Sequence, residues 1–204
     1  MSGHKTLRND AGFTLVEVVV VIAVVALLAA IMTPLIAKNI DDAKIGRAEN
    51  EAQVIAAAVG NFYKDVGRWP SMDASGAYNG VTTLVSGNSG LAGTAINSNG
   101  WVSSTSGATV DFIENHLLNN APKGTGAYPA TGRSSWRGPY LNAAPLDPWG
   151  SPYMVNIAAT NTSAAPLKAL VISAGPNGVM DTAFATTRTT LAGGDDIAVS
   201  FHVR

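Results

Sequence analysis

One acidic residue at the edge of a long apolar segment limits what this chain can fold into. Between Val18 and Met32 no residue is polar. With its apolar neighbours the segment covers about residues 15–37, and a helix of roughly 20 such residues crosses a hydrocarbon core. Glu17 lies inside this segment. Because a carboxylate in a spanning helix costs about 2.5 to 3.5 kcal/mol at the centre and less near an end, we expect Glu17 to have a partner or a function.

The short segment before the apolar stretch is basic. It contains His4, Lys5 and Arg8, with Asp10 as its one acid. Positive charge beside a first spanning helix keeps that end of the chain in the cytoplasm. The sequence therefore predicts a single-pass membrane protein with its N-terminus inside and its remaining residues outside.

Two simpler interpretations of this segment stay open on the residues alone. A secretory signal peptide has the same basic and apolar regions, and Ala26 to Ala30 would supply small residues near a cleavage site. The apolar run, however, exceeds the usual length of roughly 7 to 15 residues. A plain signal anchor explains the span but gives no role to Gly12, Phe13 or Glu17.

Composition indicates one exported domain and argues against several functions. The chain has 204 residues, a formal charge of −1 and no cysteine. We therefore expect no disulfide and no nucleic-acid partner. The three histidines are His4, His116 and His202. Because the sequence has no zinc spacing, nucleophile elbow or phosphate loop, we expect no enzymatic activity.

Beyond Pro34 the sequence still predicts helix. Gly67 and Pro70 supply the stop signals, so the helix should cover residues 13–66. Its first half has the composition of a membrane or filament segment. Its second half carries an apolar stripe at spacings of 3 and 4, which we expect to pack on the protein's own sheet. The stripe comprises Ile45, Ala48, Ala52, Ile55, Val59 and Phe62.

The remaining residues, 67–204, predict one α+β domain. Residues 71–108 have loop composition, within a long variable region that extends to residue 133. A short helix should begin at Thr109 and direct Val110, Ile113 and Leu117 inward. Three strands are expected at residues 153–158, 167–173 and 197–203, and they should form a small antiparallel sheet beside the long helix.

Residues 12–36, GFTLVEVVVVIAVVALLAAIMTPLI, closely resemble the N-terminal segment of type IV pilin-like proteins. The resemblance implies a leader, residues 1–12, that a prepilin peptidase removes by cleavage between Gly12 and Phe13. Phe13 would then be N-methylated. Glu17 matches the family's glutamate and Pro34 its proline, and both would serve filament assembly.

Physical chemistry gives Glu17 a role consistent with this resemblance. In a filament the apolar helices pack together, and a buried carboxylate then needs a compensating charge. The new amine of Phe13 on a neighbouring subunit is such a charge. One polar contact in an apolar interface can fix the register of an incoming subunit.

The C-terminal part resembles the major pseudopilins of type II secretion. It contains, in the family's order, GPYL at 138–141, DPWGSPY at 147–153, SAGPNG at 173–178 and GDDI at 194–197. The chain departs from the family in the length of its variable region and in Asn177, where an aspartate is common.

The resemblance implies a structural subunit of a secretion pseudopilus. The globular domain would lie in the periplasm, anchored to the bacterial inner membrane. The implied partners are further copies of the chain, minor pseudopilins, the prepilin peptidase and the inner-membrane assembly platform. The alternative is a type IV pilus subunit that serves motility, adhesion or DNA uptake.

The resemblance also implies a calcium ion in the C-terminal loop. Calcium takes six to eight oxygen ligands. The candidate side chains are those of Asn177, Asp181, Asp195 and Asp196, and the carbonyl of Ala174 is a further candidate. No EF-hand spacing is present, and solvated acids beside a turn are the alternative.

Overall fold

The computed structural model describes residues 12–73, 75–87, 98–101, 109–123, 126–158, 167–184 and 193–203. The chain divides into two compact units, Met1–Ala43 and Lys44–Arg204. Both take part in helix α1, which covers Leu15–Val66 and includes Pro34. The expected long helix is confirmed. Gly67, with a φ of +70°, closes its C-terminal end, and the Gly67 N–H donates to the Tyr63 carbonyl.

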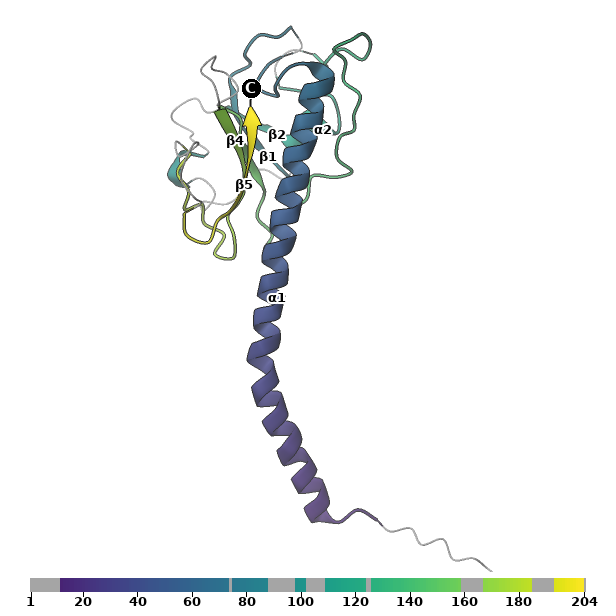
Figure 1. The fold of residues 1–204 in the computed structure, drawn as a ribbon, viewed down its shortest axis with the longest axis vertical. Coiled ribbons are helices and arrows are strands. Elements are labelled where there is room, and N and C mark those ends of the chain that lie inside the picture. Colours follow the sequence, from purple (N-terminus) through teal and green to yellow (C-terminus); the bar gives the residue numbers. More distant parts are fainter. Residues whose placement is uncertain are drawn as a thin grey trace, which may run out of the picture. The chain divides into compact units, whose positions relative to one another are not determined.

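In the second unit, α1 lies beside the sheet (Figure 1). The predicted apolar stripe is buried from Ala48 onward, whereas Ile45 at its start is only partly buried. Ala52, Ile55, Val59 and Phe62 are at most 1% exposed and join one core cluster with the sheet residues Val155 and Val171. Each large apolar side chain buried in this way stabilises the fold by about 1.5 to 3 kcal/mol. The face is rich in alanine, which permits close approach of helix and sheet.

The sheet has five strands in the order β2-β1-β3-β4-β5. The β2–β1 pair is parallel, whereas β1–β3, β3–β4 and β4–β5 are antiparallel. The fold is therefore α+β, as expected, with a mostly antiparallel sheet. The other helical elements are η1 (Ser98–Gly100) and α2 (Ile113–Leu117), and the strands are β1 (Val81–Val85), β2 (Thr109–Phe112), β3 (Met154–Asn156), β4 (Leu167–Ser173) and β5 (Ile197–Val203).

Two expectations for the variable region are wrong. Residues 71–108 are not all loop, because they contain β1, whose sequence VTTLV is β-branched and mostly buried. The short helix does not begin at Thr109, because Thr109–Phe112 form β2 and the helix starts at Ile113. Long-range pairing with β1 decides the conformation of residues 109–112, and local helix signals cannot reveal such a pairing.

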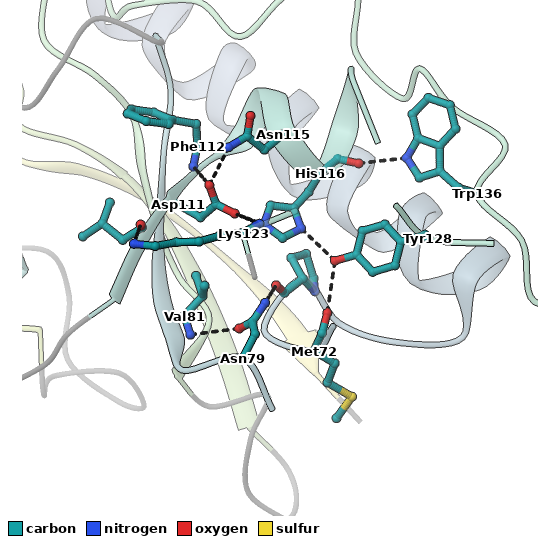
Figure 2. Close-up of polar contacts among 12 residues, drawn as sticks. Met72, Asn79, Val81, Asp111, Phe112, Asn115, His116, Lys123, Tyr128 and Trp136 are labelled. Atoms are coloured by element: carbon teal, nitrogen blue, oxygen red, sulfur yellow. Dashed lines mark hydrogen bonds and ion pairs between the residues drawn. The ribbon is translucent and has the colours of Figure 1, made fainter. Parts of the chain in front are cut away.

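A buried polar network fixes the end of β2 and α2 (Figure 2). His116 is fully buried, and its Nε2 lies 2.9 Å from Oδ2 of Asp111. Its Nδ1 lies 2.8 Å from the hydroxyl of Tyr128. The rings of His116 and Tyr128 both contact Phe62 of α1 edge-on. The network therefore connects the variable region to the central helix.

The contacts of this network centre on Asp111. Its carboxylate accepts from the backbone N–H groups of Phe112 and Lys123 and from the Asn115 amide, and Nε2 of His116 is its fourth partner. The Tyr128 hydroxyl lies 2.8 Å from Nδ1 of His116 and 3.1 Å from the Met72 carbonyl oxygen, so it links the histidine to residue 72.

Opposing effects set the pKa of Asp111. Burial raises it, but the hydrogen bond and charge of His116 and the donors of Lys123 and Asn115 prevail, so the pKa lies below its ordinary value. Because the native pKa is depressed, the stability that Asp111 contributes is present above its unfolded pKa. It is lost as the pH falls through the native pKa.

We therefore expect Asp111→Asn to lower the free energy of unfolding at pH 7 by about 3 kcal/mol, since several buried donors would lose their charged acceptor. The difference from the original chain should shrink as the pH falls below about 4, the ordinary pKa of an aspartate in the unfolded chain, towards the lower native pKa of Asp111. Urea unfolding of a soluble fragment beginning at Lys38, between pH 2 and 7, measures both effects. Asp42→Asn, at an exposed acid of α1, is the control. A difference that stays constant down to pH 2 would contradict this account.

Candidate functional site

The N-terminal candidate site begins with two exposed residues, Gly12 and Phe13, which precede α1. Phe13 is 89% exposed. Thr14 caps the helix, since its Oγ1 accepts the N–H of Glu17 at 3.3 Å. In return, Oε2 of Glu17 accepts the Thr14 N–H and hydroxyl, each at 2.8 Å. These reciprocal bonds form a capping box.

The capping box is an arrangement that our sequence analysis missed. Its signal, Thr-x-x-Glu before an apolar run, is present at residues 14–17. Both groups that donate to Glu17 are neutral, so they do not balance the negative charge of its carboxylate. That charge is favourable beside the helix dipole and remains available to a cation.

The apolar half of α1 is uncovered in the described part of the chain. Its large side chains from Val18 to Ile36 are 49–64% exposed. By length and composition α1 is able to cross a membrane, with a mean hydropathy of 3.1 in its most apolar window. A helix that is apolar on all sides needs lipid or other helices around it.

The C-terminal candidate site joins the end of β4 to the start of β5. Asn177 connects two of the predicted ligands, because its N–H donates to Oδ2 of Asp195 at 2.9 Å and its side-chain amide donates to Oδ2 of Asp181 at 3.3 Å. Its own Oδ1 accepts the Val179 N–H at 2.5 Å. Asn177 therefore closes the turn that holds these two acids.

The other two candidates, Asp196 and Ala174, are buried residues. Asp196 is buried, and its Oδ2 accepts the Thr182 N–H at 2.6 Å. Burial and the nearby charge of Asp181 raise the pKa of Asp196, although its hydrogen bonds with Thr182 and the N–H of Asp181 oppose the shift. Ala174 is buried directly after β4.

Two close backbone approaches hold this loop together. A methyl group on Gly175 would overlap the backbone carbonyl of Asp195, and one on Gly194 would overlap the side chain of Asp181. Both glycines also have positive φ, of +64° and +56°. A side chain at Gly175 would therefore require a shift of the backbone, and one at Gly194 would require the Asp181 side chain to move and would be strained at this φ.

The loop leaves carboxylate oxygens without partners. Oδ1 of Asp195 and Oδ1 of Asp196 are buried and accept no hydrogen bond from the described residues. A cation would satisfy such oxygens. Among the described residues, however, no three His, Cys, Asp or Glu side chains are grouped to hold a metal. A calcium ion here would need main-chain or amide oxygens as well.

A supporting contact from outside the loop was also missed in the sequence. Asp147 is buried, and its Oδ1 accepts the N–H groups of Trp149 and Ser151. Its Oδ2 accepts the Ser173 hydroxyl at 2.6 Å, and Oγ of Ser173 accepts the Gly175 N–H at 3.1 Å. The DPWG turn therefore supports the C-terminal loop. The Asp followed by turn residues was the available signal.

Comparison with known families gives two matches. The prokaryotic N-terminal methylation motif matches residues 7–33. The type II secretion system (T2SS), protein G, family matches residues 117–187, which include β3, β4 and the first part of the C-terminal loop.

Two characterised relatives match over longer stretches. The type II secretion system core protein G of Pseudomonas aeruginosa is 27% identical over 147 residues, which are 72% of this chain and 72% of that protein. The fimbrial protein EcpC of Eikenella corrodens is 32% identical over 108 residues, which are 48% of this chain and 71% of that protein. No solved structure gives a significant match.

Proposed function

The chain belongs to the type IV pilin-like superfamily, and from that premise we propose that it is a structural subunit of a type II secretion pseudopilus. The observation that carries the proposal is that two separate regions of the chain each match a family of this kind. The methylation motif covers the start of α1, and the protein G family covers β3, β4 and the first part of the C-terminal loop. The family is structural, consistent with the expectation that the chain is not an enzyme.

The N-terminal segment supports a specific order of processing, membrane anchoring and assembly. We propose that the peptidase cuts between Gly12 and Phe13, which lie outside any regular element and are exposed. The apolar half of α1 would hold the subunit in the inner membrane, with the domain in the periplasm. Assembly would then replace lipid by the helices of other copies, with minor pseudopilins and the assembly platform as further partners.

Glu17 would guide this step. Its carboxylate is bound by the neutral donors of Thr14 and lacks a cation in the described part of the chain. Removal of the leader creates an ammonium group on Phe13. In an interface without water, attraction between that group on one copy and Glu17 on the next would set the register.

We expect Glu17→Leu to leave membrane insertion and leader cleavage largely intact but to reduce filament yield at least tenfold, because the register contact is lost. Glu17→Gln, which retains the shape and can still accept the Thr14 donors, should fail similarly if charge is what matters. Val16→Ala, at the neighbouring exposed position, is the matched control. Filament counts in shearing preparations, with cleavage followed by mass, measure these effects. A normal filament yield from Glu17→Leu would contradict the proposed role of this residue.

A type IV pilus subunit is the second candidate, favoured by the similarity to a fimbrial protein. The two functions differ in their machinery. A pseudopilus subunit should be required for secretion of folded proteins by its host, whereas a pilus subunit should be required for surface fibres. Deletion of the gene distinguishes them.

We further propose that the C-terminal loop binds one structural calcium ion. The buried oxygens of Asp195 and Asp196 support this, as does the loop's content of negative charge, to which Asp181 adds. The carbonyl of Ala174 and the amide oxygen of Asn177 are the neutral candidates. The ion would neutralise the acids and hold the ends of the loop together.

We expect the soluble fragment beginning at Lys38 to melt several degrees higher in calcium than in a chelator. A ligand at 100 times its Kd stabilises the native state by about 2.7 kcal/mol. Asp195→Ala should abolish the difference, and Asp42→Ala should keep it. Identical melting temperatures in calcium and chelator would remove the metal from this account.

A further inference from the structure

A groove runs along the second half of α1, within the unit Lys44–Arg204. Its volume is about 340 Å³. Asn50, Glu51 and Val54 line it on the helix side, and Leu141, Asn142 and Pro145 line it on the other. Val54 is 57% exposed, an unusual position for valine on a helix whose opposite face forms the core. The groove therefore presents apolar surface between two amide side chains.

The one charge in the groove is already compensated. Oε2 of Glu51 accepts the hydroxyl of buried Tyr153 at 2.7 Å, and Oε1 accepts Nε of Arg47 at 2.8 Å. These two bonds fix the carboxylate and neutralise it. The groove therefore fits an occupant that is apolar and uncharged, with small polar groups at most.

The chain itself carries such a segment. Helical spacing places Met32, Ile36 and Ile40 one turn apart on one face of α1, and Asn39 beside them. These three apolar side chains are 52–56% exposed. The charged residues of the same stretch, Lys38, Asp41 and Asp42, lie on the opposite face. At the end of the spanning stretch α1 therefore changes from apolar on all sides to apolar on one face, which extends past the charged residues to Ile40. A one-sided apolar face is what a helix presents to protein.

We propose that the groove receives the Met32, Ile36 and Ile40 face of a second copy of this chain, an inference that rests on the proposed filament. The contact joins two different surfaces of identical subunits, so it repeats from copy to copy and generates an open helical array. Ile36 would lie against Val54 and Leu141, and Asn39 against the amides of Asn50 and Asn142. The contact would add a specific register to the less specific packing of the apolar helices.

Cysteine crosslinking tests this contact, because the chain has no cysteine of its own. The variant with Ile36→Cys and Val54→Cys, expressed as the full chain with its assembly machinery, should give a ladder of disulfide-linked oligomers on mild oxidation. Each single variant can form dimers at most. The control pairs Ile36→Cys with Asn61→Cys, an exposed residue on the Val54 face about 10 Å further along the helix. Since a disulfide needs Cα atoms within about 7 Å, the control should give no ladder.

The outcomes separate this inference from the proposed function. Filaments of the original chain together with a ladder from the first pair alone would support the groove. Normal filaments without a ladder, or equal ladders from both pairs, would overturn it while the pseudopilus stands. Absence of filaments from the original chain would overturn both. As a second measurement, Val54→Glu should reduce filament yield at least tenfold and Val54→Ala by less than twofold. Neither substitution should change the melting temperature of the globular domain.

Discussion

The fold depends on how one helix distributes its apolar surface. From Ala48 to Val66 most apolar side chains of α1 are concentrated on one face and are buried in the domain core, with Val54 as an exposed exception. From Val18 to Ile36 they surround the helix and are exposed. Each large side chain gains about 1.5 to 3 kcal/mol on burial, so the first half cannot remain in water. The same element therefore builds the domain with one half and requires a membrane or other subunits for the other.

Polar contacts hold the parts of the domain that the core does not cover. The side chains of His116, Asp111 and Tyr128 anchor the variable region (Figure 2). The rings of His116 and Tyr128 both contact Phe62 of α1. At the other end of the sheet, Asp147 secures Ser173 and through it the turn at Gly175. In both places the buried carboxylate, of Asp111 or of Asp147, is fully hydrogen-bonded. A fully satisfied polar network of this kind specifies one loop conformation at little cost in stability.

Elements with a strong local signal were predictable from the sequence. The apolar stripe and the stop at Gly67 predicted α1, and β-branched runs predicted β4 and β5. β1 was missed because its five residues lie among glycine and serine, and β2 because its partner is distant in the sequence. Of the candidate site, the acids of the C-terminal loop were identified by type and by resemblance. Their orientations, and the role of Asn177 in joining Asp181 to Asp195, depend on backbone geometry that no residue pattern encodes.

The central claim is that this chain is processed and polymerised through its N-terminal helix. Electron microscopy of filaments made by the full chain with its assembly machinery, and the mass of the N-terminus in the same sample, test it most directly. The account predicts filaments whose subunits begin at N-methylated Phe13. A chain that keeps residues 1–12 and stays monomeric beside an active peptidase would contradict it and would return the N-terminal segment to a plain membrane anchor.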